Sequence, residues 1–376
     1  MIYLDNASTT KPSKAAATAF LEACENFGNP SSLHRLGLAA EKIINSAKGA
    51  VGEALAVPPK SVFFTSGGTE SNNTAILGYC RANAKRGRHI ITTRVEHPSV
   101  SAPFARLESE GFSVTYLGVD RFGRISLAEL EQALREDTIF VSVMAANNEV
   151  GTIMPIEEIK PVMKRKSPIA ALHVDAVQAF GKIPLMPSKW GVDFMSLSSH
   201  KIHGVKGTGV LYMANEHIKP IIIGGGQQKD LRSGTENVPG IAAFGAAVRE
   251  IGTDNSEMKK TRLLLKEKLS EKIENIVFNG SDEYQTGYVL NVSFKGIKAE
   301  ILLHMLENKD IYVSTGSACS SNKPMPSKVL TAMGCPDEDI TGAVRFSFSE
   351  PISEEDIEKV SEETAAAVRE IRKYMR

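Results

Sequence analysis

Lys201 has the sequence surroundings of a lysine used in chemistry. It follows the apolar run 194–197, and residues 198–204 read Ser-Ser-His-Lys-Ile-His-Gly. A lysine at the C-terminal end of a buried strand can be desolvated, and a desolvated amine is a nucleophile that forms Schiff bases. Most lysines are solvated, so on its own Lys201 is more simply explained as part of a surface loop. Chemistry at this position requires suitable partners elsewhere in the chain.

An aldehyde cofactor on Lys201 would need an acid, a stacking group and a group that holds the substrate. If the cofactor has a pyridine ring, the acid must meet the ring nitrogen, because a protonated pyridine withdraws electrons from the substrate carbon. Asp175 ends the apolar run 169–174 and is the candidate acid, with a helix N-cap as its alternative role. His97 is the candidate for stacking and proton transfer, or it caps a loop. Arg345 can fork onto a carboxylate or serve as a structural ion-pair partner.

A phosphate site is indicated where a predicted strand runs into a helix through Gly67 and Gly68. Free backbone N–H groups and the positive end of the helix dipole suit a phosphate there. Thr69, Ser198 and His200 are the side chains that could complete the site. Most strand–glycine–helix turns bind nothing, and the sequence holds no GxxxxGK[ST] loop.

Four cysteines are present, and their spacing matches neither a zinc site nor a disulfide framework. Cys24 and Cys80 lie in helical patterns, which is typical of small core residues. Cys335 follows a helix end, and packing there is favoured over a role as a resolving thiol. Cys319 lies in a run of small residues with no apolar partner to bury its thiol, which favours chemical use over an incidental position.

The composition bounds the class of protein. The chain has 376 residues, 42% of them hydrophobic and 23% charged, which is typical of a soluble globular protein. Lys+Arg and Asp+Glu are equal at 44 each, so no excess of positive charge argues for nucleic acid or a membrane as an obligatory partner. The N-terminus has neither a basic region nor a long apolar region, and we expect a cytoplasmic protein with no metal site.

The order of elements predicts an α/β fold. Strands are expected at 62–65, 89–93, 113–117, 138–144, 169–174 and 210–213, with helices between most of them. This alternation predicts a large domain with a mostly parallel sheet, whose ligands bind at the carboxyl ends of the strands. A smaller C-terminal α/β domain follows, with predicted helices at 257–273 and 298–308 and a strand at 288–294. The expected boundaries are 1–255 and 256–376, with residues 1–15 able to pack against the smaller domain.

Ten short segments match a known family in order and spacing. They are residues 3–10, 28–34, 65–72, 96–97, 147–151, 174–178, 198–204, 232–235, 314–320 and 345–347. Through them the chain resembles, from end to end, the pyridoxal-phosphate-dependent cysteine desulfurases (NifS- and IscS-like) of the aminotransferase class V group. The resemblance implies a fold type I large domain with a seven-stranded sheet. Val205 departs from the proline usual in the family at this position.

The resemblance also implies a role for each candidate residue. The residues that hold pyridoxal 5′-phosphate are Lys201 (Schiff base), Asp175 (pyridine nitrogen), Gln178 (phenolic oxygen), His97 (stacking), Gly68, Thr69, Ser198 and His200 (phosphate), Asn148, and Thr235 from the other subunit of a homodimer. Asn148 and Arg345 hold the substrate carboxylate. L-cysteine loses its α-proton to the freed Lys201 amine or to His97. The thiolate of Cys319 then takes the sulfur, leaving L-alanine.

Two other functions stay open. One is another enzyme of the same group, such as a selenocysteine lyase or an aminotransferase, and the other is a non-catalytic scaffold for sulfur trafficking. Cys319 argues against transamination, which needs no protein thiol. The sulfur acceptor is expected to be a protein, such as an iron–sulfur scaffold or an enzyme of tRNA thiolation or thio-cofactor synthesis, and the sequence does not choose among these.

Overall fold

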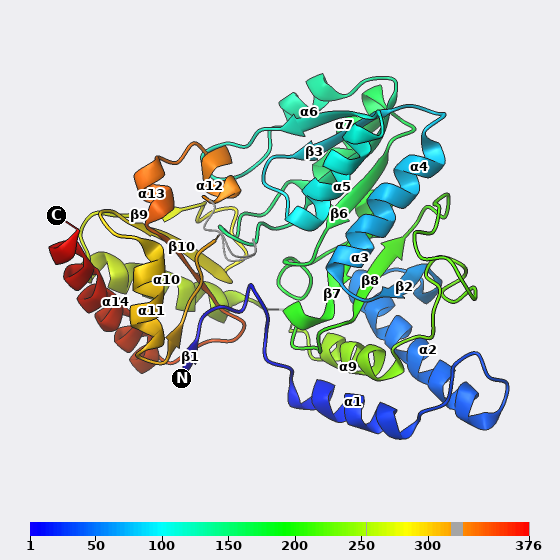
Figure 1. The fold of residues 1–376 in the computed structure, drawn as a ribbon, viewed down its shortest axis with the longest axis horizontal. Helices are drawn as coiled ribbons and strands as arrows, with labels where there is room; N and C mark the ends of the chain where they lie inside the picture. Colours follow the sequence, from blue (N-terminus) through cyan, green and yellow to red (C-terminus); the bar gives the residue numbers. More distant parts are fainter. Residues whose placement is uncertain (253, 317–325, 376) are drawn as a thin grey trace.

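The larger part of the protein is built on a seven-stranded sheet (Figure 1). The structure is a computed structural model that describes residues 1–252, 254–316 and 326–375. The strand order is β2-β8-β7-β6-β5-β3-β4. The bounds are β2 Val62–Thr65, β3 His89–Thr93, β4 Ser113–Leu117, β5 Thr138–Met144, β6 Ala171–Asp175, β7 Phe194–Ser198 and β8 Gly209–Met213. Strand β8 runs antiparallel to β2 and β7, and the other neighbours are parallel, which confirms the predicted mostly parallel sheet.

Helices cover both faces of this sheet, because each has an apolar stripe that packs away from water. On one face lie α3 Gly68–Asn73, α4 Tyr79–Asn83 and α5 Pro98–Ser109. On the other lie α2 Arg35–Leu55, α6 Leu127–Ala133, α7 Ile156–Lys166 and α9 Val238–Arg249. The short α8 spans Pro187–Trp190, and α1, Lys14–Glu25, packs along α9.

The smaller part of the protein, on the left in Figure 1, has its own sheet and core. Its three strands are antiparallel in the order β12-β10-β9, with bounds β9 Ile276–Asn279, β10 Val289–Phe294 and β12 Ala343–Ser347. The helices are α10 Ser256–Lys272, α11 Ala299–Glu307, α12 Lys328–Ala332, α13 Asp337–Thr341 and α14 Glu354–Tyr374. The N-terminal β1, Ile2–Tyr3, pairs in parallel with β11, Ile311–Tyr312, so the start of the chain joins this part.

The structure departs from the predicted elements in a few places. The helix expected between the strands at 62–65 and 89–93 is divided into α3, a π-helical turn Thr74–Gly78 and α4. Strand β9 was not predicted, since it is short and half-buried. Cys24 is exposed, and its assignment to a core was wrong. Only one side of α1 faces α9, and that side carries Ala16 and Ala23. In the described part of the chain, no helix has the length and apolar character needed to cross a membrane.

Candidate active site

Asp175, Ser198 and Lys201 lie at one edge of the large sheet. Asp175 is the last residue of β6 and Ser198 the last residue of the neighbouring parallel strand β7. Lys201 follows within a single 3₁₀ turn, Ser199–Lys201. Its Nζ donates to the carbonyl oxygens of Ala7 and Ser8, both at 2.7 Å. The fold therefore brings the predicted lysine and the predicted acid to the carboxyl ends of adjacent strands, where ligands of such sheets bind.

The N-terminal segment 5–10 covers Lys201. The backbone N–H of Thr10 donates to the His200 carbonyl at 2.9 Å, and the Thr10 hydroxyl donates to the same oxygen at 3.1 Å. His200 Nδ1 lies 3.1 Å from Thr9 Oγ1. Burial, together with the neighbouring cations Lys201 and Lys206, lowers the pKa of His200 to about 4, so its ring is neutral.

A chain of hydrogen bonds connects Asp175 to His97. Asn72 Nδ2 donates to Asp175 Oδ2 at 2.8 Å and to Ser99 Oγ at 2.9 Å, and Ser99 Oγ lies 2.7 Å from His97 Nδ1. The backbone N–H of Ser99 also donates to His97 Nδ1, at 3.1 Å, which leaves the ring proton on Nε2. Burial lowers the pKa of His97, and the cation of Lys201 adds to this against the opposite effect of Asp175. Sequence reasoning missed Asn72, although it lies in a matched segment.

Both side chains make capping contacts, but His97 caps a helix where a loop was expected, and Asp175 caps a turn where a helix was expected. His97 is the N-cap of α5, and Asp175 Oδ1 accepts the backbone N–H of Val177 at 3.0 Å. His97 uses Nδ1 for its cap and keeps Nε2 for a ligand, whereas both Asp175 oxygens already accept one hydrogen bond and each can accept a second donor. Capping therefore orients these two side chains without excluding a role in the site.

The predicted phosphate site lies at the start of α3. A methyl group on Gly68 would lie 2.5 Å from Val177 Cγ2 and 3.7 Å from Ser198 Cβ, so Gly68, Val177 and Ser198 are neighbours. Glycine is required at Gly68 by this close approach, because a side chain there would collide with Val177. Thr69, one residue further along α3, is exposed and available to a ligand.

Gln178 is held on both sides. Its Nε2 donates to the Ala7 carbonyl at 2.8 Å, and its Oε1 accepts from Lys182 Nζ at 2.9 Å. The Ala7 oxygen also accepts from Lys201, so Gln178 and Lys201 share one carbonyl. Sequence reasoning missed Lys182. The available signal was its spacing of four residues from Gln178, which places two side chains together on a helical turn.

Arg345, on a C-terminal strand, contacts both the N-terminal segment and a loop that follows β5 of the large sheet. Arg345 lies on β12 and is only 2% exposed. Its Nη2 donates to Asp5 Oδ1 at 2.7 Å and to Ser8 Oγ at 2.8 Å, and its Nη1 donates to the Asn148 carbonyl at 3.1 Å. Its Nε is buried with no hydrogen-bond partner among the described residues. The ion-pair alternative is thus realised, and the Nε donor remains for a ligand.

Two buried carboxyl groups near the site were not given roles from the sequence. Burial raises the pKa of Glu96 to about 8, and nearby Asp175 adds to the rise. Glu96 Oε1 accepts from the Thr93 hydroxyl and the Met144 N–H, both at 2.9 Å. Burial likewise raises the pKa of Glu149 to about 7, and its Oε2 accepts from the Ser327 hydroxyl at 2.5 Å.

The remaining candidates are not brought to Lys201 by any described contact. Thr235 is exposed in the segment between β8 and α9. Cys319 lies outside the described residues. The described residues on either side of it approach Glu149, since a methyl group on Gly316 would lie 2.3 Å from Glu149 Oε2 and Ser327 donates to the same atom.

Comparison with known proteins identifies the family. A family profile described as Aminotransferase class-V matches residues 2–360. A cysteine desulfurase IscS of Methanosarcina thermophila is 43% identical over 99% of this chain and 93% of that protein. A NifS/IcsS protein homolog of Lactobacillus delbrueckii subsp. bulgaricus is 44% identical over 93% of this chain and 92% of its own length.

Solved structures agree with these relatives. A structure described as a NifS-like protein has a TM-score of 0.89 and 37% identity, covering 100% of this chain and 99% of its own. A structure described as SspA in complex with cysteine has a TM-score of 0.84 and 31% identity, covering 94% of this chain and 100% of its own. The chain therefore belongs to the aminotransferase class-V family, among its cysteine desulfurases.

Proposed function

We propose that the protein removes sulfur from L-cysteine, leaves L-alanine, and passes the sulfur to an acceptor as a persulfide, with pyridoxal 5′-phosphate as cofactor. The observation that carries this proposal is the meeting of the Lys201 amine, the Asp175 carboxylate and the Asn72–Ser99–His97 chain at one sheet edge. An amine, an acid and a stacking ring are what an aldehyde cofactor with a pyridine ring requires.

The residues at this edge fit pyridoxal phosphate. Lys201 offers an amine for the aldehyde, and Asp175 offers an acid for the ring nitrogen. Gly68 has no side chain at the start of α3, where a methyl group would collide with Val177. Lys201, Asp175 and His97 would hold the ring and Gln178 its phenolic oxygen. The phosphate would be held by Gly68, Thr69, Ser198 and His200, with Asn148 completing the cofactor contacts. When bound, this cofactor supplies an electron sink for the carbanion that forms when an amino acid loses its α-proton.

The chain's own groups would handle protons and substrate. The Lys201 amine, held by the Ala7 and Ser8 carbonyls, accepts the α-proton, and His97, with its ring proton on Nε2, is placed to donate a proton. Arg345 and Asn148 hold the substrate carboxylate, and the free Nε of Arg345 supports this role. Charge-assisted bonds of this kind are the strong ones, which is why a buried arginine suits a carboxylate.

Cys319 would take the sulfur. Its thiolate attacks the substrate sulfur, and an S–S bond forms as the substrate's Cβ–S bond breaks. The electron pair of that bond passes to the β-carbon, and a proton on the β-carbon and one returned to the α-carbon give alanine. The protein is left with a persulfide. A protein sulfur acceptor must then remove it, such as an iron–sulfur scaffold or an enzyme of tRNA thiolation or thio-cofactor synthesis.

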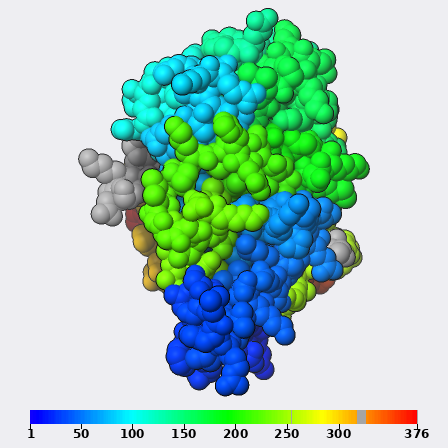
Figure 2. Space-filling view, turned by 90° about the vertical axis from the view of Figure 1, so that its right-hand side faces the viewer, coloured from blue at the N-terminus to red at the C-terminus, as the bar shows by residue number. Residues whose placement is uncertain are grey.

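We also propose that the protein is a cytoplasmic homodimer, with Thr235 reaching the partner's cofactor phosphate. Large apolar side chains are exposed on α1, α2 and the segment between them, namely Leu21, Phe27, Leu33, Leu36 and Leu38. Figure 2 shows this dark-blue region on the same face as the lime-green segment that contains Thr235. A second copy would remove this apolar surface from water. Full activity of a monomeric species would contradict the proposal.

The division at residues 255 and 256 is also a proposal. Its support is the second core, which draws on β9 to β12, α10, α11 and α14, and which also takes in Ile2 and Leu4. The first residues of the segment 1–15 would therefore belong to the smaller domain. Further along the same segment, the carbonyls of Ala7 and Ser8 accept hydrogen bonds from Lys201.

The test combines a spectrum with a product assay. The purified protein, supplied with pyridoxal phosphate, should absorb visible light, and Lys201→Ala should abolish the absorption of the bound form. A colourless parent protein would refute the cofactor assignment. Cys319→Ala should keep the chromophore and lose release of alanine from cysteine. If Cys319→Ala releases alanine as fast as the parent, sulfur transfer to Cys319 is wrong. Selective turnover of selenocysteine would favour a lyase, and a bound cofactor without turnover would favour a scaffold.

A further inference from the structure

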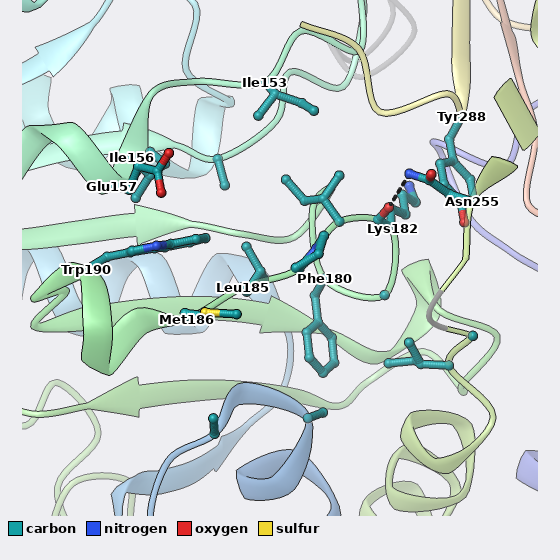
Figure 3. Close-up of a pocket in the computed structure, with 18 of the residues that line it drawn as sticks. Ile153, Ile156, Glu157, Phe180, Lys182, Leu185, Met186, Trp190, Asn255 and Tyr288 are labelled. Carbon is teal, nitrogen blue, oxygen red and sulfur yellow. Dashed lines mark hydrogen bonds between the residues drawn. The ribbon is translucent and has the colours of Figure 1, made fainter.

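Lys182 is a buried lysine between the active site and a separate cavity. Its side chain is 7% exposed. Behind it lies a cavity of about 1070 Å³, lined in part by Phe180, Trp190 and Tyr288. Figure 3 shows Lys182 at one side of this cavity, next to Tyr288, with its backbone carbonyl accepting a hydrogen bond from Asn255. That bond is 3.2 Å long, and the Lys182 Nζ lies 5.7 Å from the centre of the Tyr288 ring.

The Lys182 ammonium has unusual partners for a buried charge. No carboxylate oxygen of the described residues lies within 4 Å of it in an ion pair, and its hydrogen bond goes to the neutral Gln178 amide at 2.9 Å. Two cations act on it, Lys201 from the 3₁₀ turn and Arg345 from β12. The titratable side chain of Tyr288, the residue before β10, faces it as well. Burial, Lys201 and Arg345 lower the pKa of Lys182 to about 7. Such a group costs stability, so packing alone does not account for it.

The contact with Gln178 has a definite geometric effect. An ammonium can only donate, so the Gln178 atom that faces Lys182 must be Oε1. The Ala7 carbonyl can only accept, so the atom facing it must be Nε2. A flipped amide would place two donors against each other at Lys182 and two acceptors against each other at Ala7. The amide is thus fixed with its donor toward the carbonyl that Lys201 also uses.

We propose that Lys182 is a positioning residue, which orients the Gln178 amide toward the cofactor and places a positive charge behind it. This inference rests on the proposed function, because Gln178 is assigned there to the phenolic oxygen of pyridoxal phosphate. A cation behind Gln178 disfavours a proton on the neighbouring nitrogen of Lys201, just as Lys201 lowers the pKa of Lys182. Removing the charge should therefore make protonation at residue 201 easier.

Lys182→Met tests the proposal, since methionine has similar length and no charge. The readout is the pH at which the visible absorption of the bound cofactor changes in the holoenzyme. We expect this midpoint to rise by on the order of one pH unit, the effect of one nearby charge at protein-like dielectric. We also expect kcat to fall about threefold to tenfold with little change in KM for cysteine, as for loss of one hydrogen bond.

Lys160→Met is the matched control. Lys160 is a half-buried lysine of α7. Its Nζ donates to Asp193 Oδ2 at 2.6 Å and to the Ala170 carbonyl at 3.0 Å, and these two residues directly precede β7 and β6. It lies at the opposite end of these strands from Lys201. Its replacement should lower the melting temperature and leave the spectral midpoint unchanged.

Four outcomes are distinguished. A raised midpoint in Lys182→Met, together with a loss of kcat that disappears in a Gln178→Met background, confirms the effect of the charge and the action through Gln178. An unchanged midpoint in a folded Lys182→Met protein overturns the proposal, and so does an equal shift in the Lys160→Met control. A parent protein with no chromophore refutes the proposed function instead, so the two failures are distinguishable.

Discussion

Replacing Glu149 by glutamine should stabilise the protein at alkaline pH. Burial raises the pKa of this carboxyl from 4.5 to about 7, against the smaller opposing effects of Ser327 and Arg345. Each tenfold change in proton affinity is worth about 1.36 kcal/mol, so keeping Glu149 ionised in the folded state costs about 3 kcal/mol. Because the folded pKa is the higher one, the group's contribution is complete below pH 4.5 and is lost as the pH rises through about 7. Glutamine keeps an oxygen for the Ser327 hydroxyl and does not titrate.

Guanidinium unfolding of the holoenzyme at two pH values measures this effect. At each pH, the unfolding free energy of the parent protein is subtracted from that of Glu149→Gln. This difference should be about 2.5 kcal/mol larger at pH 8.5 than at pH 5. Glu25→Gln, which changes an exposed carboxylate on α1, is the control and should show no comparable difference. A relative stability of Glu149→Gln that is the same at both pH values would refute the reasoning.

Three further substitutions probe the site. Gly68→Ala should weaken cofactor binding about tenfold or more, because its methyl group would lie 2.5 Å from Val177 Cγ2, and Val177→Ala should restore the affinity measured by dialysis. Asn72→Leu removes the donor to Asp175 and should cost about 2 kcal/mol in thermal unfolding, with a loss of cofactor affinity; an unaltered holoenzyme would show that Asn72 is dispensable. Arg345→Lys should raise KM for cysteine about tenfold, since lysine lacks the fork, and an unchanged KM would place the substrate carboxylate elsewhere.

Hydrophobic periodicity was sufficient to predict the fold class. The apolar runs of β5, β6 and β7 and the apolar spacing in α2 depend on local sequence, because strands and helices bury residues at fixed intervals. The same runs indicated where strands end, and polar residues at those ends gave Asp175, Ser198 and Lys201. Elements without such a pattern were missed, as β9 was. The sequence of α1 also did not show which of its sides meets a neighbour, so Cys24 was wrongly assigned to the core.

The sequence by itself determined the residue types of the site and their order along strand ends and helix starts. Only the tertiary structure decided which of them meet. Arg345 and Asp5 are 340 positions apart and form an ion pair, and Gln178 meets Ala7 across 171 positions. No local period encodes such contacts, because they arise when the N-terminal segment crosses between the two cores. The pairing of Lys182 with Gln178 has a local spacing, but its burial beside Lys201 and Arg345, and hence its lowered pKa, depends on how the rest of the chain packs around it.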